Sequence, residues 1–338
     1  MTKSNHDQAD EQLLADEKIL GARRELTPKQ VMTQTGVDYE MLINYWQALG
    51  LPVSGSSEPI FTQDDAHALK DMSDLANNED FETRTIISLV RSVGHTTERL
   101  ALWQAEALVE HMAVRYELDD VSARLMVLDR ISSLSAILEY QLVHAWRRQL
   151  AALMSRWTGE FSNSRGQVID NKTLPLPRAV GFADIVSFTT KTAQMHSAQL
   201  SEFVSNFESA ARDVVTAAGG RVVKTIGDAV LFIADDLNLG ANVALGLAKA
   251  STDLANRELP QVRVSLVWGR VLSRFGDVFG PSVNLAARLT DEAPPGQVLI
   301  DELTAEHLVT NDSIKLQQQP TLRLTGIGDV KPSILEFA

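Results

Sequence analysis

The spacing of apolar residues divides the chain into a helical half and a mixed half. Across 25–158, apolar residues recur every three or four positions, which is typical of amphipathic helices. Over 178–338, shorter β-branched runs alternate with helical segments. The intervening segment, 159–177, is rich in Ser, Asn, Gly and Pro and predicts a linker. Residues 1–24 are polar with scattered leucines and predict a short helix or a frayed N-terminal arm.

The first helices of the helical half have a helix-turn-helix outline over 27–51. Thr27 followed by Pro28 predicts a helix start, and Gly36 predicts the turn to a second helix. The outline resembles the start of a MerR-like winged helix. DNA binding would need cationic residues on the second helix, but 38–46 contains none. The pattern therefore favours a structural helical module.

A long helix is expected over 121–157, because neither Gly nor Pro interrupts it. One seam of this helix carries Leu128, Ile131, Ser135, Leu138, Leu142, Ala145 and Ala152. Such a seam is typical of a helix that pairs with a copy of itself, and equally of a buried helix in a bundle. Upstream, Asn77-Asn78 and Gly94 are the expected breaks between shorter helices.

The mixed half predicts a βαββαβ order, as in a ferredoxin-like α+β sandwich. The expected segments are a strand from 180 into a loop by 189, a helix over 197–218, a hairpin over 221–234, a helix over 238–256, a strand over 262–272, a helix beginning at 283–289 and a strand over 297–301. The predicted fold class is therefore α+β, with this domain preceded by an all-α region.

Composition excludes several classes of protein. No run approaches the roughly 18 apolar residues of a membrane span. The polar start carries no export signal, and the absence of cysteine excludes disulfides, so we expect a cytoplasmic protein without membrane association. The net charge of -13 argues against broad binding to nucleic acid or anionic lipid.

Two acidic residues occupy comparable places in the mixed half. Asp228 lies in the hairpin turn. An isolated Asp at such a place usually only stabilises the turn, because its side chain bonds the nearby backbone. Asp184, however, ends the first strand, so the two carboxylates can meet at one edge of the sheet. Carboxylate oxygens suit Mg²⁺ or Mn²⁺. Downstream, Asn284 and Arg288 are four residues apart on one helix face and can hold a sugar and a charged phosphoryl group.

Three motifs carry a resemblance to a known family. They are Phe182-Ala-Asp-Ile-Val-Ser-Phe-Thr189, Lys224-Thr-Ile-Gly-Asp228 and Asp277-Val-Phe-Gly-Pro-Ser-Val-Asn-Leu-Ala-Ala-Arg288. Each is weak alone, but their combination and order are specific. Residues 178–338 thus resemble a class III nucleotidyl cyclase domain. The resemblance implies conversion of ATP to 3′,5′-cyclic AMP and pyrophosphate, with two divalent metal ions, Mg²⁺ or Mn²⁺.

The resemblance also implies roles for individual residues. Asp184, Asp228 and the carbonyl of Ile185 would bind the metals. Lys224 and Asp277 match the pair that recognises adenine. The remaining expected positions are Asn284 for the ribose, Arg288 for the transition state, Arg270 for a phosphate, and Phe188 and Thr189 for substrate contacts. Ile327 occupies a position where some relatives have a phosphate-binding Lys.

In class III cyclases the metal aspartates come from one subunit and the remaining groups from its partner, so the resemblance implies a homodimer with two shared sites. The helix at 121–157 is placed to set that pairing. The helical half, 25–158, resembles the regulatory domain of soluble bacterial cyclases, among them pH-responsive ones. Two alternatives are a guanylyl cyclase, in which Glu and a small residue typically replace Lys224 and Asp277, and a non-catalytic transcriptional module using 27–51.

Overall fold

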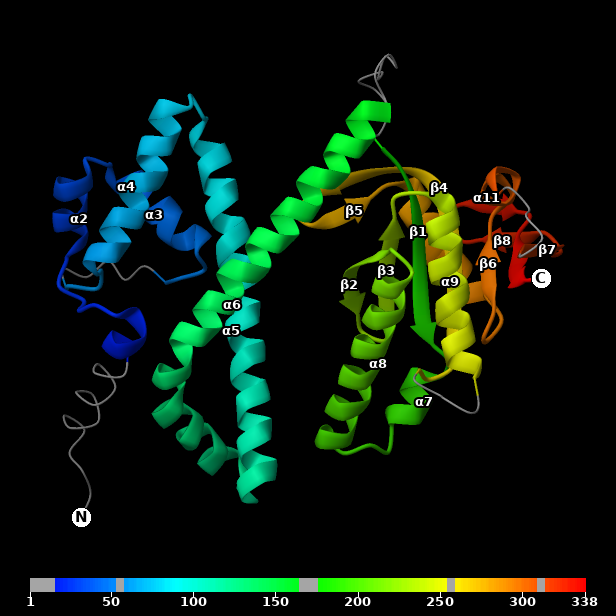
Figure 1. Cartoon of the computed structure of the whole chain (residues 1–338), viewed down its shortest axis with the longest axis horizontal. Helices are drawn as coiled ribbons and strands as arrows, with labels where there is room; N and C mark the ends of the chain where they lie inside the picture. Colours follow the sequence, from blue (N-terminus) through cyan, green and yellow to red (C-terminus); the bar gives the residue numbers. More distant parts are fainter. Residues whose placement is uncertain (1–15, 53–57, 164–175, 254–258, 309–313) are drawn as a thin grey trace. The chain divides into compact units, whose positions relative to one another are not determined.

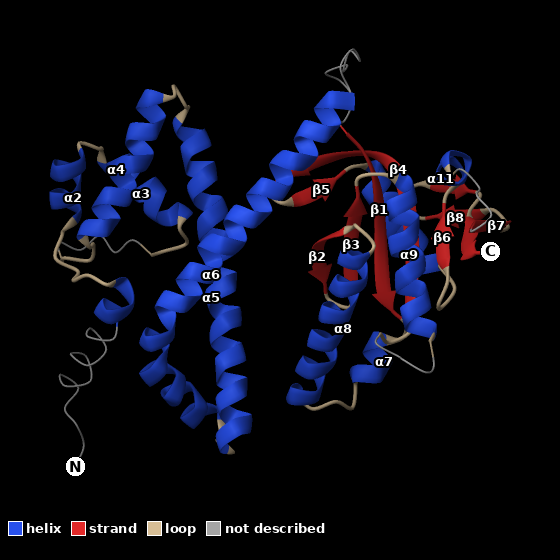
Figure 2. Cartoon of the chain, viewed as in Figure 1, coloured by secondary structure: helices blue, strands red, loops and turns tan. Residues whose placement is uncertain are grey.

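The computed structural model describes residues 16–52, 58–163, 176–253, 259–308 and 314–338 (Figure 1). The chain divides into two compact units, Met1–Arg165 and Gly166–Ala338. The described part of the first unit is helical, whereas the second combines a sheet with helices (Figure 2). This agrees with the predicted α+β class. Most of the predicted arm and linker, 1–15 and 164–175, lies outside the described residues.

The first unit contains α2 (Pro28–Thr35), α3 (Tyr39–Ala48), α4 (Gln63–Asn78), α5 (Thr83–Tyr116) and α6 (Asp120–Asn163). Its first four helices enclose a small core in which Leu42, Phe61 and Leu69 are fully buried. The Trp46 ring meets Phe61 edge-on, with ring centroids 4.7 Å apart. These contacts account for the apolar spacing of α2, α3, α4 and the start of α5, because these elements turn apolar side chains to a shared core.

The predicted helix-turn-helix outline is present as α2 and α3. Thr27 caps α2 and forms a capping box with Gln30. Gly36 ends α2 in the left-handed conformation, with φ of 74°, which is favourable for glycine. Helix α3 contains Glu40 and no lysine or arginine. The structure therefore offers no cationic recognition helix here.

The predicted break at Gly94 is wrong, because Gly94 lies inside α5. A Cβ atom added to Gly94 would lie 2.5 Å from the backbone oxygen of Ala48 and 2.6 Å from the Cα of Leu49. Glycine is thus required by the close approach of the end of α3 and not by a turn. The break at Asn78 is confirmed as the last residue of α4.

Helix α6 is longer than the predicted 121–157 and continues past Gly159 to Asn163. Its start packs against α5, where Ala123 and Val127 join Val109 and Met112 in a small cluster. Farther along, α6 exposes a series of large apolar side chains. These are Leu128, Ile137, Tyr140, Leu142, Val143, Trp146, Leu150, Met154 and Trp157.

The described strands of the second unit form an eight-stranded sheet and a separate two-stranded ribbon. The large sheet has the order β2-β3-β1-β4-β6-β10-β7, with β5 paired to β4. Its strands are β1 (Leu176–Ile185), β2 (Arg221–Ile226), β3 (Ala229–Ala234), β4 (Val262–Arg274), β5 (Asp277–Phe279), β6 (Val298–Ile300), β7 (Ile314–Gln318) and β10 (Ser333–Phe337). The ribbon pairs β8 (Leu322–Leu324) with β9 (Gly328–Val330). The β2-β3-β1-β4 order is that of the predicted ferredoxin-like core.

Helices cover both faces of the sheet. They are α7 (Phe188–Thr192), α8 (Ser197–Ala217), α9 (Leu237–Thr252), α10 (Pro281–Glu292) and α11 (Glu302–His307). Helices α8 and α9 pack on one face (Figure 1), and α10 packs on the other. Alternation along β1 sends Ala179 and Ala183 to the α8 and α9 face, and Val180 and Phe182 to the α10 face. By the same alternation Asp184 belongs to the α10 face. None of the helices in the described ranges has the length and apolar character of a membrane span.

Candidate active site

The two acidic residues of the first two motifs meet at one end of the sheet. Asp184 is the penultimate residue of β1, and Asp228 lies in the two-residue turn between β2 and β3. Asp184 is directly opposite Ala229 in the antiparallel register. The backbone N–H of Ile185 donates to the carbonyl oxygen of Asp228 across 3.1 Å. Hydrogen bonding of the backbone therefore holds the two acidic residues next to each other.

The surroundings of Asp184 oppose its ionisation overall. Burial raises the pKa of its carboxyl group, and the negative charge of Asp228 raises it further. Arg263 acts in the opposite direction, since its Nη2 donates to Oδ2 of Asp184 across 2.9 Å. Two carboxylates so placed repel each other, and a cation between them would relieve this repulsion.

The donor set at this edge fits a hard divalent cation. Among the described residues, no group of three or more His, Asp or Glu side chains is placed to hold a metal. The ligands that the resemblance implies are Asp184, Asp228 and the carbonyl of Ile185, and the two carboxylates carry the charge that a divalent cation would balance. Mg²⁺ commonly uses one or two carboxylates and completes its octahedron with water and substrate phosphates. The site is therefore suited to a cation that arrives with a phosphorylated substrate.

Lys224 and Asp277 form an ion pair although they are far apart in sequence. Lys224 belongs to β2, next to an irregularity in the pairing with β3. Asp277 opens β5, and its other oxygen, Oδ1, accepts from the backbone N–H of Val278 across 2.8 Å. The structure thus joins the second and third motifs through a cation and an anion, both partly exposed and able to bind polar groups of a ligand.

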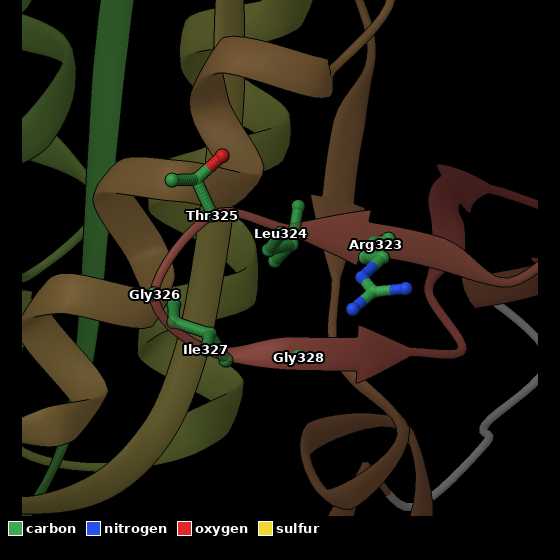
Figure 3. Close-up of a pocket in the computed structure, with 6 residues that line it drawn as sticks. All are labelled: Arg323, Leu324, Thr325, Gly326, Ile327 and Gly328. Atoms are coloured by element: carbon green, nitrogen blue, oxygen red, sulfur yellow. The ribbon is translucent and has the colours of Figure 1, made fainter.

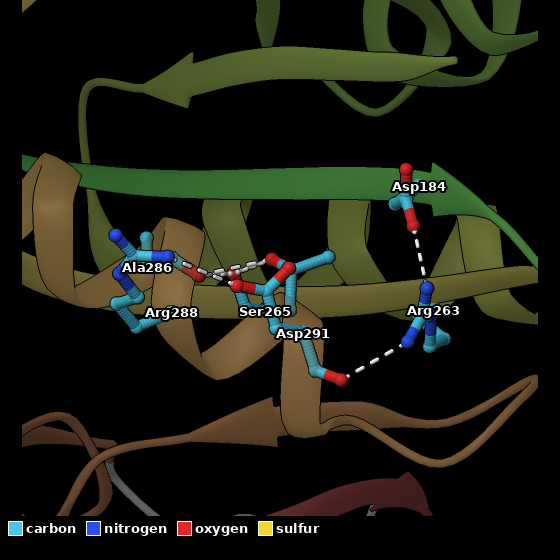
Figure 4. Close-up of polar contacts among 7 residues, drawn as sticks. Asp184, Arg263, Ser265, Ala286, Arg288 and Asp291 are labelled. Atoms are coloured by element: carbon cyan, nitrogen blue, oxygen red, sulfur yellow. Dashed lines mark hydrogen bonds and ion pairs between the residues drawn. The ribbon is translucent and has the colours of Figure 1, made fainter. Parts of the chain in front are cut away.

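Helix α10 presents the remaining polar residues of the third motif. Asn284 and Arg288 are exposed on one face, as their four-residue spacing predicts. Nη1 of Arg288 lies 3.5 Å from Oδ2 of Asp291. Figure 4 shows how buried hydroxyl groups fix this helix to β4. Oγ of Ser265 donates to the carbonyl of Ala286 across 2.7 Å, and Oγ1 of Thr290 lies 2.8 Å from Oγ of Ser265.

Comparison with known proteins agrees with the motifs and the fold. Residues 177–336 match the family model described as the adenylate and guanylate cyclase catalytic domain. An adenylate cyclase of Glutamicibacter nicotianae is 39% identical over 325 residues, which cover 94% of this chain and 80% of the relative. The chain belongs to the class III adenylate cyclase family.

Two further members of the family extend the comparison. The pH-sensitive adenylate cyclase MT1302 of Mycobacterium tuberculosis is 28% identical and covers 90% of this chain and 77% of its own length. Among solved structures, the adenylyl cyclase CyaB from P. aeruginosa aligns with a TM-score of 0.41 and 20% identity. That alignment covers 47% of this chain and 93% of CyaB. The alignments with the Glutamicibacter nicotianae enzyme and with MT1302 span both halves of the chain, so the similarity includes the helical region.

The three other residues that the resemblance assigns to substrate binding differ from one another in exposure and packing. Arg270 is exposed on β4, opposite Pro177 of β1. The ring of Phe188 is partly buried and stacks on Phe203 of α8, with centroids 6.2 Å apart. Thr189 is exposed in the short helix α7, where the sequence predicts a loop. These residues stay predictions as substrate contacts.

The position where some cyclases have a phosphate-binding lysine lies between β8 and β9. A shallow surface pocket there is lined by Arg323, Leu324, Thr325, Gly326, Ile327 and Gly328 (Figure 3). Ile327 is exposed and offers no hydrogen-bond donor in its side chain. Arg323 is the cationic residue of this set. It lies on β8, four positions before Ile327.

Sequence reasoning missed the polar residues that surround the expected site. Arg263, Ser265, Thr290 and Asp291 make contacts that no motif indicated (Figure 4). A signal was present for the first two, since they lie at alternate positions among the apolar residues at the start of β4. On a strand covered by α10, polar residues need partners on that helix or on the neighbouring strand.

Proposed function

We propose that the chain is an adenylyl cyclase that converts ATP to 3′,5′-cyclic AMP and pyrophosphate by in-line attack of the ribose 3′-hydroxyl on the α-phosphate. The observation that carries this proposal is the meeting of Asp184 with Asp228 at one edge of the sheet. Contact between Lys224 and Asp277 supports the choice of adenine. Relatives named adenylate cyclase that align over most of the chain support the same activity.

Asp184, Asp228 and the carbonyl of Ile185 would hold two divalent metal ions, Mg²⁺ or Mn²⁺. When bound, such ions lower the pKa of the attacking hydroxyl and offset the charge of the phosphates. The contribution of the chain is to keep both carboxylates at one edge, where the hydrogen bond between β1 and the hairpin turn fixes them. Partial burial strengthens their interaction with any cation, because less water screens the charges.

Recognition of the base follows from hydrogen-bond matching. Asp277 accepts from the amino group of adenine, and Lys224 donates to a ring nitrogen. Guanine presents an oxygen and a ring N–H at the corresponding positions, so it would leave both side chains mispaired. Arg270, Phe188 and Thr189 would complete the contacts with the nucleotide.

Helix α10 would act on the sugar and the transferred phosphoryl group. The amide of Asn284 orients the ribose. The guanidinium of Arg288 offsets negative charge that develops on the phosphoryl group, so its contribution is greatest in the transition state. The hydroxyl contacts between α10 and β4 hold the helix that carries both residues.

Two shared sites in a homodimer would complete this arrangement. The metal ligands of one subunit would face the base, ribose and transition-state residues of the partner. The exposed apolar side chains of α6 support such pairing, since large apolar surfaces are usually covered in solution. The helical unit would then regulate the enzyme by changing the population of the paired arrangement.

The first test compares ATP turnover of the full chain and of Asp184→Asn with Mn²⁺. The amide keeps the shape of the side chain but loses its charge, so we expect turnover to fall by a factor of about 100 or more. Asp236→Asn is the matched control, because Asp236 caps α9 with its side chain and Asn is an equally good cap. Full activity of Asp184→Asn would contradict the proposal.

The second test addresses the base. We expect the full chain to prefer ATP to GTP, and the double variant Lys224→Glu with Asp277→Ser to lose at least about 100-fold in ATP turnover. The loss with GTP should be much smaller, because that pair no longer opposes guanine. Turnover of both nucleotides by the two proteins measures this. An unchanged preference for ATP in the double variant would contradict the assignment of these residues, and a preference for GTP in the unmodified chain would favour the guanylyl alternative.

A further inference from the structure

Gly269 of β4 lies directly beneath the first turn of α10. By the alternation of the strand it belongs to the face that carries Val267 and Val271, on which α10 packs. A Cβ atom added to Gly269 would overlap the hydroxyl oxygen of Ser282 and would lie 2.9 Å from the Cβ of Ser282. Gly269 does not have a positive φ, so glycine is needed here for space and not for backbone conformation.

The strand beneath this contact is fixed at both of its edges. Gly269 is directly opposite Arg178 in the antiparallel pairing of β4 with β1. One residue earlier, the backbone N–H of Trp268 donates to Oγ1 of Thr304 across 2.7 Å, and Thr304 is fully buried. Bulk added at Gly269 would therefore displace the helix and not the strand.

The first turn of α10 has few other contacts that could hold it. In the described part of the chain no side chain caps this helix, since its N-cap is Gly280. The middle of the helix, by contrast, is held by the hydroxyl of Ser265, which donates to the carbonyl of Ala286 (Figure 4). The position of the first turn thus depends on its packing against Gly269, whereas the next turn has a separate constraint.

Asn284 is the site residue that this first turn carries. It follows Ser282 by two positions, so the two side chains lie on opposite sides of the helix, Ser282 half-buried and Asn284 exposed. A displacement of the first turn away from β4 would move Asn284 with it. Arg288 lies beyond Ala286 and would move less. A misplacement of about 1 Å in a group that orients a substrate can lower the rate by a factor of about 100.

We propose that Gly269 is a positioning residue for the cyclase reaction. Because it has no side chain, the first turn of α10 packs directly on β4, and this contact sets the position of Asn284 against the ribose. The inference rests on the proposed function, in which Asn284 orients the ribose. Gly269 acts through Ser282 and the helix that carries both residues.

The test measures kcat and KM for ATP with Mn²⁺ on the full chain. Gly269→Ala is expected to lower kcat about 10-fold and to change KM by less than about 2-fold, because the misplaced group acts mainly in the transition state. Ser282→Gly removes both atoms that the new methyl group would meet. The double variant Gly269→Ala with Ser282→Gly should therefore recover most of the lost kcat, and Ser282→Gly alone should stay within about 2-fold of the unmodified chain.

A second cycle, with Asn284, separates positioning from a general structural role. Asn284→Ala removes the side chain whose position is at issue. If Gly269 acts through this side chain, Gly269→Ala should lower the kcat of the Asn284→Ala chain by less than about 2-fold. A loss of about 10-fold in both backgrounds would mean that the two residues act independently, and would overturn the inference.

Gly240→Ala is the matched control. Gly240 lies on α9, on the other face of the sheet, where an added Cβ atom would overlap the Cβ of Ala179 and lie 3.2 Å from Cδ1 of Leu266. This change crowds the same sheet without touching α10. Thermal melts give the folded fraction of each variant at the assay temperature. We expect folded Gly240→Ala to keep the kcat of the unmodified chain, and an equal loss of kcat there would contradict a specific role for Gly269.

The remaining outcomes are equally decisive. Full kcat in folded Gly269→Ala would refute the inference, and so would a loss that Ser282→Gly does not recover. If Gly269→Ala does not fold, Ser282→Val adds bulk to the same contact from the helix side, and full kcat in that variant would refute it in the same way.

The unmodified chain separates the two proposals. If it forms no cyclic AMP from ATP, the cyclase activity is wrong and the role of Gly269 is wrong with it. Normal turnover by the unmodified chain beside full kcat in Gly269→Ala refutes only the role of Gly269.

Discussion

Asp301 shows how a single residue can make the stability of the second unit depend on pH. It lies at the start of α11 and is 5% exposed. Its Oδ1 accepts from the hydroxyl of Thr304, and this hydroxyl oxygen accepts from the backbone N–H of Trp268 across 2.7 Å. Burial raises the pKa of Asp301, and the hydrogen bond from Thr304 offsets this only in part.

The raised pKa gives a definite sign to the pH dependence. The folded chain binds the proton more tightly than the unfolded chain, so the contribution of this proton to stability is fully present below about pH 4 and is lost as pH rises through the folded pKa. Asp301→Asn removes the charge and should therefore become more stable relative to the unmodified chain as pH rises from 4 to about 7. Melting temperatures across this range measure the difference.

Asp236→Asn again provides the control, since Asp236 is a helix cap on an exposed position. Its melting temperature relative to the unmodified chain should stay nearly constant over the same range. A constant difference for Asp301→Asn would show that its charge does not limit stability.

At the scale of single residues, the sequence indicated the polar groups at turns and helix faces but not their buried partners. Asp184 and Asp228 could be predicted to meet because both lie at the ends of strands that pair. Lys224 and Asp277 were paired only through the family resemblance, since they are separated by 53 positions. The contact of Arg263 with Asp291 depends on where α10 ends over β4, which no local pattern specifies.

At the scale of elements, the placement of α10 depends on buried hydroxyl groups. Ser265 and Thr290 are almost fully buried and bonded to each other and to the carbonyl of Ala286. Their contacts link β4 to the middle of α10. They lie on the buried side of this helix, whereas Asn284 and Arg288 lie on its exposed side. Each such hydrogen bond contributes about 1 kcal/mol to stability. Because hydrogen bonds are directional, they also fix the orientation of α10 on β4, which apolar packing alone does not.

Replacing both hydroxyl groups should weaken the positioning of α10. For Ser265→Ala combined with Thr290→Val we expect a fall of about 1 to 2 kcal/mol in unfolding free energy. The kcat for ATP should fall several-fold while KM changes little, because Arg288 acts mainly in the transition state. Steady-state kinetics and thermal unfolding measure the two effects.

Ser251→Ala is the control for this element. Ser251 is also fully buried, but its hydroxyl donates to Ala248 within its own helix, α9, across 2.8 Å. It should lower stability without changing kcat. Equal kcat in the double variant and the control would show that packing alone positions α10.

Elements with strong periodicity were predictable, and short or irregular ones were not. The helix expected over 197–218 is α8, and the expected hairpin is β2 and β3 with their Gly227-Asp228 turn. By contrast, α7 and β5 contain five and three residues, too few to show a period. The prediction of a break at Gly94 was wrong because glycine is needed there for contact with the end of α3. That contact is distant in sequence, so no local pattern reveals it.

At the scale of the whole molecule, one subunit would contribute different halves to two active sites. Chains with Asp184→Asn and chains with Arg288→Ala should each be nearly inactive. When the two are coexpressed, a mixed dimer contains one site with both residues intact. With random pairing, half of the dimers are mixed, so activity should recover to about a quarter of that of the unmodified protein.

The measurement is ATP turnover of purified mixed protein beside the two single variants. Coexpression of Asp184→Asn with Asp228→Asn is the matched control, because both changes affect the same half of a site and no mixed dimer has an intact one. Recovery in the control, or its absence in the first mixture, would contradict shared sites.

The central position of β1 bears on how motion is distributed through the enzyme. Strand β1 is paired with β3 and with β4 along the whole stretch from Ala179 to Asp184. Its amides are released only when the sheet itself opens, so local unfolding at the surface leaves this strand intact. The carboxylate of Asp184 is then a fixed reference point. Local opening is instead expected in elements with fewer partners, such as the exposed turn at Phe275 and Gly276 between β4 and β5.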